Sequence, residues 1–221
     1  MSAESLTYRV RPAAGDPDGA LVLLHGRGAS EDDLAALADV LDREARLVAL
    51  LPRGPLALPP GGAHWYIVRE IGYPDRETFL TSFGRASAWL DAVLAEAGIP
   101  SGRTVLAGFS QGAVMSYSLG LGAGRPRPAG ILAMSGFVPR VDGFDFDLSS
   151  HAGMPVSISH GVADPVIGVE WGRDARDRLT GAGLDVRYRE DPIGHSISPG
   201  ALAQAKQALD DALPSLASSS A

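Results

Sequence analysis

The chain has 221 residues, of which 45% are hydrophobic and 20% charged, and this balance predicts a globular protein with room for one sizeable core. Its formal net charge of −7 at pH 7, with no basic cluster, argues against nucleic acid as a partner. The absence of cysteine excludes disulfides, thiolate nucleophiles and cysteine-based zinc sites.

Apolar runs that predict strands alternate with segments of helical period along the chain. Strands buried on both faces are predicted at residues 20–24, 45–51, 103–109, 130–134, 155–160 and 184–189, and an antiparallel edge strand at 6–10. Helices are predicted at residues 31–42, 81–97, 111–121, 169–179 and 199–213. This alternation predicts an α/β fold with a mostly parallel central sheet and helices on both faces.

The N-terminus shows no secretory signal, and a processed precursor that has lost its signal is the alternative. The N-terminal stretch MSAESLTYRV lacks the apolar segment of a secretory signal, and no apolar run is long enough to span a membrane. We therefore expect a cytoplasmic protein without a membrane span. We expect one domain over residues 1–221, with frayed ends at 1–4 and 216–221.

The segment 52–75 breaks the alternation. It is rich in proline and glycine and shows no clear helix or strand pattern. Irregular segments of this length inside a compact domain are usually functional, so we expect part of it to line a binding pocket.

The stretch GFSQG places Ser110 where the strand 103–109 gives way to the helix 111–121. A serine between two nearby glycines at such a corner is typical of a nucleophile elbow, which holds the hydroxyl in strained geometry at the carboxyl end of a strand. The alternative is a glycine-rich corner with an incidental serine. The helix N-terminus beside Ser110 would favour negative charge that develops there.

A serine hydroxyl needs a base to accept its proton. His195 lies in the stretch IGHSIS, after the last predicted strand, and can reach the sheet edge that carries Ser110. His25 and His160 also end strands and remain alternative bases. No histidine or carboxylate pattern in the chain indicates a metal site.

The base in turn needs a carboxylate that orients it. Asp164 follows the strand 155–160 and is expected at the same sheet edge, whereas Asp191 is closer to His195 in the sequence and is the competing candidate. The chain order of Ser110, Asp164 and His195 is that of the α/β-hydrolases.

Two backbone N–H groups are candidates for stabilising an oxyanion. One belongs to Gln111, directly after the serine, and the other to Arg27, in the HGRG loop that follows the first buried strand. The glycines of that loop also suggest a dinucleotide-binding turn. Glu31 occupies the place of its third glycine, however, and would repel a pyrophosphate.

Seven stretches over residues 20–209 resemble, in order and spacing, the phospholipase/carboxylesterase family of α/β-hydrolases, which includes small bacterial carboxylesterases and acyl-protein thioesterases. The resemblance implies little or no cap domain, Ser110 as nucleophile, Asp164 and His195 as acid and base, and Arg27 and Gln111 at the oxyanion positions. Members of this family are often dimers, which makes a homodimer a candidate assembly, and the chemistry expected of these residues requires no metal or organic cofactor. The stretches are LLHGRGAS, LPRGP, HWY, GFSQGAVMS, AMSGFVP, HGVADPVI and GHSIS.

We therefore predict a serine hydrolase that cleaves small carboxylic esters, thioesters or lysophospholipids through an acyl-enzyme. The alternative is a protein of the same fold that binds a ligand or partner without turnover. Ile67 follows the aromatic pair of HWY where the family commonly has aspartate, and this departure concerns substrate preference. The expected walls of a shallow, apolar pocket are Leu56, Trp65, Tyr66, Phe137, Val166 and Ile167.

Overall fold

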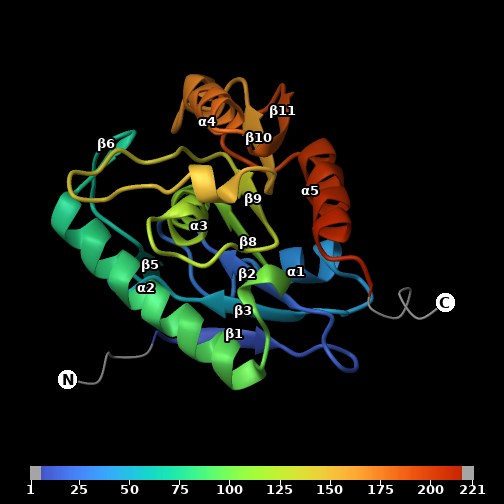
Figure 1. Ribbon diagram of the computed structural model, residues 1–221. Coiled ribbons are helices and arrows are strands. Elements are labelled where there is room, and N and C mark those ends of the chain that lie inside the picture. Colours follow the sequence, from blue (N-terminus) through green and yellow to red (C-terminus); the bar gives the residue numbers. More distant parts are fainter. Residues whose placement is uncertain (1–5, 216–221) are drawn as a thin grey trace.

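The computed structural model describes residues 6–215 and centres on a seven-stranded sheet (Figure 1). The strands lie in the order β1-β3-β2-β8-β9-β10-β11, with β1 antiparallel to β3 and the remaining pairs parallel. The mostly parallel sheet predicted from the sequence is thus confirmed. The bounds are Tyr8–Arg11 (β1), Ala20–Leu24 (β2), Val48–Pro52 (β3), Thr104–Phe109 (β8), Gly130–Met134 (β9), Pro155–Gly161 (β10) and Asp185–Asp191 (β11).

Helices cover both faces of the sheet (Figure 1). Two of them, α1 and α5, pack on one face with one hydrophobic cluster, and α2, α3 and α4 pack on the other face with a second cluster. Their bounds are Ala35–Leu41 (α1), Arg76–Ala97 (α2), Gln111–Leu121 (α3), Val169–Gly181 (α4) and Pro199–Ala212 (α5), with short 3₁₀ turns at Ser101–Arg103 (η1) and Ser149–His151 (η2).

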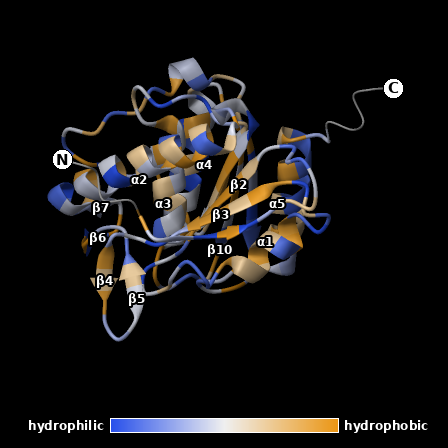
Figure 2. Ribbon diagram, turned by 90° about the horizontal axis from the view of Figure 1, so that it is seen from below, coloured by the Kyte–Doolittle hydropathy of each residue, from blue (hydrophilic) through white to orange (hydrophobic). Residues whose placement is uncertain are grey.

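Strand β2 shows why the sequences of the inner strands are continuous apolar runs. Its alternate residues Leu21 and Leu23 belong to the cluster beneath α1 and α5, whereas Val22 and Leu24 belong to the opposite cluster. Because successive side chains of a strand point to opposite faces, both faces of this strand must be apolar. Figure 2 shows the central strands as the hydrophobic interior between more polar helices.

Several boundaries differ from the sequence-based expectation for identifiable reasons. Helix α2 begins five residues early because the Asp75 side chain accepts a hydrogen bond from the Thr78 N–H and caps it. Helix α1 begins at Ala35 because residues 31–34 form turns, in which Asp33 accepts hydrogen bonds from both the backbone and the hydroxyl of Ser30. Strand β11 runs on to Asp191, two residues further than predicted.

The prediction that segment 52–75 is irregular is wrong. It folds into two small hairpins, in which strand β4 (Leu56–Leu58) pairs with β5 (Gly62–His64) and β6 (Val68–Glu70) pairs with β7 (Tyr73–Pro74). Strands of two or three residues are too short to show a period-two pattern, and the prolines and glycines mask them further.

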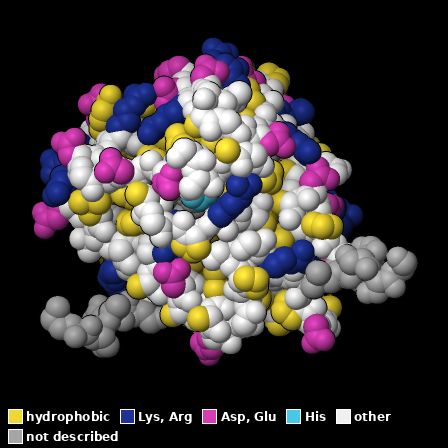
Figure 3. All heavy atoms as spheres, in the orientation of Figure 1, with side chains coloured by type: hydrophobic (Ala, Val, Ile, Leu, Met, Phe, Trp, Pro, Cys, Tyr) yellow, Lys and Arg dark blue, Asp and Glu magenta, His cyan; other side chains and the backbone are white. Residues whose placement is uncertain are grey.

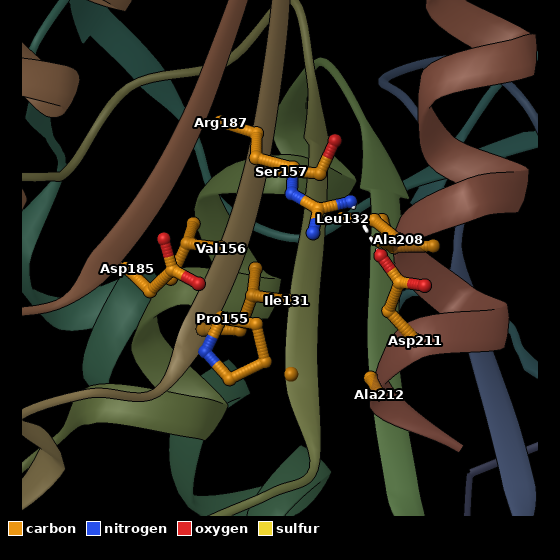
Figure 4. Close-up of a pocket in the computed structure, with 11 residues that line it drawn as sticks. Ile131, Leu132, Pro155, Val156, Ser157, Asp185, Arg187, Ala208, Asp211 and Ala212 are labelled. Carbon is orange, nitrogen blue, oxygen red and sulfur yellow. Dashed lines mark ion pairs between the residues drawn. The ribbon is translucent and has the colours of Figure 1, made fainter. Parts of the chain in front are cut away.

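The outside of the molecule carries mixed charge. Figure 3 shows acidic and basic side chains interspersed over one face. Near the start of β11, Arg187 forms an ion pair with Asp211 of α5 at 2.6 Å (Figure 4). Among residues 6–215, no helix combines the length and apolar character that a membrane crossing requires. The ends expected to fray, 1–4 and 216–221, lie outside the described residues.

Candidate active site

Ser110 lies at a sharp turn between β8 and α3, with φ 56° and ψ −121°, in a region that residues other than glycine rarely adopt. Its N–H donates to the Met134 carbonyl at 2.9 Å, which ties the turn to the end of β9. A Cβ atom at Gly112 would collide with the Leu24 carbonyl, so only glycine lets α3 approach β2 this closely. The local sequence therefore holds the serine in place.

Ser110, His195 and Asp164 form one hydrogen-bonded relay. The Nε2 atom of His195 lies 2.9 Å from the Ser110 Oγ, and its Nδ1 atom lies 2.7 Å from the Asp164 Oδ2. These residues follow β8, β11 and β10, whose carboxyl ends meet at one sheet edge because the strands are parallel. The Phe109 ring packs against the imidazole, with centroids 4.8 Å apart.

The Asp164 carboxylate is buried yet well supported. Its Oδ1 accepts hydrogen bonds from the N–H groups of Val166 at 2.8 Å and Ile167 at 2.9 Å. Burial raises the pKa of Asp164, but the hydrogen bonds from His195, Ile167 and Val166 outweigh it and leave the pKa below its ordinary value. The carboxylate therefore stays ionised and holds the Nδ1–H tautomer of His195, whose Nε2 faces the serine.

The competing candidates have other partners. The Asp191 carboxylate accepts hydrogen bonds from Arg189 and from the Ser198 hydroxyl, and it anchors the start of α5. The His160 Nε2 lies 2.8 Å from the Ile167 carbonyl and 3.6 Å from the Asp164 Oδ2, so this histidine supports the turn that carries Asp164.

The two proposed oxyanion donors lie at the same edge. Among residues 6–215, no acceptor binds the backbone N–H of Arg27 or of Gln111. The loop of Arg27 is fixed by two hydrogen bonds to β5, from the Gly28 N–H to the Ala63 carbonyl and from the Ala63 N–H to the Ala29 carbonyl, both 2.8 Å. Backbone N–H groups that are held in place and have no protein acceptor can bind the negative charge that develops on the substrate oxygen during the reaction.

A cavity of about 320 Å³ opens at this edge. The expected wall residues Tyr66, Phe137, Val166 and Ile167 do line it, and Arg27 is the one charged residue of its lining among residues 6–215. Trp65 and Leu56 do not line it, which corrects that expectation. Trp65 is fully buried, and Leu56 is a half-buried residue of β4. The complete lining is Arg27, Tyr66, Val68, Ile71, Ser110, Gln111, Phe137, Val166 and Ile167.

The model of the phospholipase/carboxylesterase protein family matches residues 7–213 of this chain. The chain belongs to this phospholipase/carboxylesterase family. Acyl-protein thioesterase 1 of Yarrowia lipolytica is 31% identical over 182 residues, which cover 75% of this chain and 78% of that protein. Acyl-protein thioesterase 1 of Debaryomyces hansenii is 25% identical over 231 residues and covers 96% of this chain and 99% of its own.

Solved structures of esterases have the same fold as this chain. The carboxylesterase of Bacillus cereus superposes with a TM-score of 0.82 at 26% identity, over 95% of each chain. An esterase named PE8 superposes with a TM-score of 0.80, also at 26% identity, over 95% of this chain and 100% of that one. The α/β-hydrolase fold expected from the sequence is confirmed, and the protein is a serine hydrolase that acts on ester or thioester bonds.

In this phospholipase/carboxylesterase chain, the Gln111 side chain has a role that sequence reasoning missed. Its Oε1 accepts a hydrogen bond from the Trp65 N–H at 3.0 Å, and its Nε2 donates to the Tyr66 carbonyl at 2.9 Å. The buried amide thus ties the first turn of α3 to the cavity wall. A polar side chain amid the apolar residues of α3 was the only signal in the sequence.

His25 is the second residue whose role was missed. Its Nδ1–H donates to the Gly26 carbonyl at 2.7 Å, its Nε2 accepts from the Gly54 N–H at 2.9 Å, and its own carbonyl accepts from the Trp65 indole. Burial is the largest effect on its pKa and lowers it. His25 is therefore neutral, and its hydrogen bonds hold the loop of Arg27 in position. Among residues 6–215, no cluster of three or more acidic or histidine side chains could hold a metal ion.

Proposed function

We propose that Ser110 is the nucleophile, His195 the general base and acid, and Asp164 the carboxylate that orients His195. The single observation that carries this proposal is the continuous relay from Oγ through the imidazole to the carboxylate, with contacts of 2.9 and 2.7 Å. Such a relay activates a hydroxyl that is otherwise a weak nucleophile.

The reaction then runs in two halves. The Ser110 Oγ attacks the carbonyl carbon of the ester or thioester while His195 Nε2 takes the hydroxyl proton, and the N–H groups of Arg27 and Gln111 bind the resulting oxyanion. Collapse of this intermediate breaks the bond to the leaving alcohol or thiol, which takes the proton from His195. A water molecule, deprotonated by the same imidazole, attacks the acyl-enzyme, and the bond to Ser110 Oγ then breaks as Oγ takes the proton back from His195 and the acid is released.

The substrate class follows from the cavity. A hollow of about 320 Å³ with walls of Val68, Ile71, Phe137 and Val166 suits a small carboxylic ester with a short or medium acyl chain. Two relatives are named acyl-protein thioesterase 1, which makes a thioester the second candidate. A lysophospholipid, the cytoplasmic location and the homodimer stay predictions from the sequence, as does the absence of a nucleic-acid partner.

Hydrolysis of matched acyl esters and thioesters tests the proposal. Wild type is expected to cleave p-nitrophenyl butyrate, and Ser110→Ala is expected to lose about 10⁴-fold or more in kcat. Ser196→Ala, an exposed serine beside His195, serves as the matched control with unchanged kcat. Unaltered turnover in Ser110→Ala would show that another residue acts. The ratio of kcat/KM for the butyryl ester and a butyryl thioester then identifies the preferred bond.

A further inference from the structure

A second groove of about 440 Å³ lies next to the active-site cavity and is lined by Tyr73, Arg140, Phe144, Phe146 and Arg178 among others. Trp171 lies between the two hollows. Its ring contacts that of Phe137, which lines the cavity, at 5.6 Å, and that of Tyr73, which lines the groove, at 6.3 Å.

Arg178, in the last turn of α4, is a half-buried cation without an acceptor. Its guanidinium lies over the Phe146 ring, 5.1 Å from the centroid, and among residues 6–215 no hydrogen bond or ion pair within 4 Å engages it. A guanidinium presents five N–H donors, and withdrawing it from water without acceptors is unfavourable. Burial accordingly lowers its pKa.

Arg140 brings a second guanidinium to the same groove. It lies over the Trp171 ring at 5.2 Å and over the Tyr73 ring at 6.0 Å, and it pairs with the Asp174 Oδ1 at 2.8 Å. The two cations are close enough for Arg140 to lower the pKa of Arg178, and Asp174 is the carboxylate that opposes this effect. Aromatic rings therefore hold both planar groups in position before any ligand arrives.

Acidic side chains also line the groove. Asp142 and Asp145 lie on its wall, but the charges that act on Arg178 are those of Asp174 and Arg140. Asp174 has the larger effect of the two, yet it forms no hydrogen bond or ion pair with Arg178, so the guanidinium donors have no acceptor among residues 6–215. An added anion would supply the acceptors that the Arg178 donors lack, within reach of a second guanidinium.

We propose that this second groove binds an oxyanion, the phosphate or carboxylate group of a ligand, between Arg140 and Arg178. The rings of Phe144 and Phe146 then offer an apolar surface to the remainder of the ligand. The proposal does not depend on the roles assigned to Ser110, His195 and Asp164.

Calorimetric titration of the full chain with inorganic phosphate tests the proposal. Wild type is expected to bind phosphate with a Kd near about 1 mM, and Arg178→Gln and Arg140→Gln are each expected to weaken binding about tenfold or more. Arg176→Gln is the matched control, since Arg176 lies on the same helix over the Tyr188 ring, and its affinity is expected to stay at the wild-type value. Ser110→Ala is expected to bind phosphate like wild type, which separates this site from catalysis.

Two binding results would overturn the proposal. One is the absence of phosphate binding by wild type, and the other is an equal loss of affinity in Arg176→Gln and Arg178→Gln. Arg178→Lys guards against a folding defect, because it retains the charge and is expected to bind phosphate better than Arg178→Gln. Kinetics with p-nitrophenyl butyrate give a further check: noncompetitive inhibition or no inhibition by phosphate agrees with binding in the second groove, whereas competitive inhibition would place phosphate in the active-site cavity and overturn the proposal.

Discussion

The two ends of the central sheet are built from the same parallel strands but serve opposite purposes. At the amino end, where β9, β10 and β11 meet α5, the packing leaves a hollow of only about 10 Å³ among apolar side chains, beside the Arg187–Asp211 pair (Figure 4). At the carboxyl end the hollow measures about 320 Å³ and contains a strained serine. The first end is closed by packing, whereas the second contains the residues that we propose for catalysis, so substitutions at the two ends should affect different measurements.

The largest expected effect distinguishes two carboxylates at the reactive end. Asp164→Asn leaves the shape intact but removes the charge that holds the His195 tautomer, so kcat should fall by about 10⁴-fold. Asp191→Asn should change kcat by less than about threefold, because its partners are Arg189 and Ser198, and lower the free energy of unfolding by about 1–2 kcal/mol. Steady-state kinetics with p-nitrophenyl butyrate measure both. A larger loss of kcat in Asp191→Asn than in Asp164→Asn would reverse the assignment.

The next prediction concerns the close approach of α3 to β2 beside Ser110. Gly112→Ala should lower the free energy of unfolding by about 1–3 kcal/mol and also reduce kcat, because the added methyl pushes on Leu24, which leads into the loop of Arg27. Gly84→Ala is the control, since open space surrounds that position in α2, and it should raise stability by about 0.5–1 kcal/mol. Urea unfolding checks both variants, and equal effects would contradict the packing argument.

The free energy of unfolding should depend on pH because of His25, which is buried near the carboxyl end of the sheet. Burial lowers the pKa of His25 in the folded state, so below pH about 6.5 the unfolded chain binds a proton that the folded chain resists. The contribution of His25 to the free energy of unfolding is therefore complete above that pH. It decreases as the pH drops, by at most about 1.4 kcal/mol per pH unit. His25→Asn should show a shallower slope between pH 7 and 5 in urea unfolding. Identical slopes would exclude His25 as the cause.

The amino end should give the smallest effect and leave activity alone. Ile131 is fully buried on β9 beside the small hollow, so Ile131→Val should lower the free energy of unfolding by about 0.5–1.5 kcal/mol. Its kcat and KM should equal those of wild type, measured on p-nitrophenyl butyrate. A change in kcat would mean that the two ends are coupled through the sheet.

The sequence predicts the reactive end better than its surroundings, for a physical reason. Buried parallel strands have a clear apolar pattern, and residues that follow them must share an edge, so Ser110, Asp164 and His195 could be brought together without coordinates. Val68 and Ile71 could not be found, because hairpins of two or three residues have no periodic signal. The pairings of Gln111 and His25 depend on which loops fold over them, and spacing along the chain does not contain that information.

Labelling with a fluorophosphonate tests the central claim, that folding turns one hydroxyl at the carboxyl edge into a nucleophile. Intact-mass analysis of the folded chain should show a single adduct, mapped to Ser110 by peptide analysis. The adduct should be missing from Ser110→Ala and from protein unfolded in urea, since activation requires His195 within hydrogen-bonding distance. Folded protein that remains unmodified, or that is modified at another serine, would contradict the account.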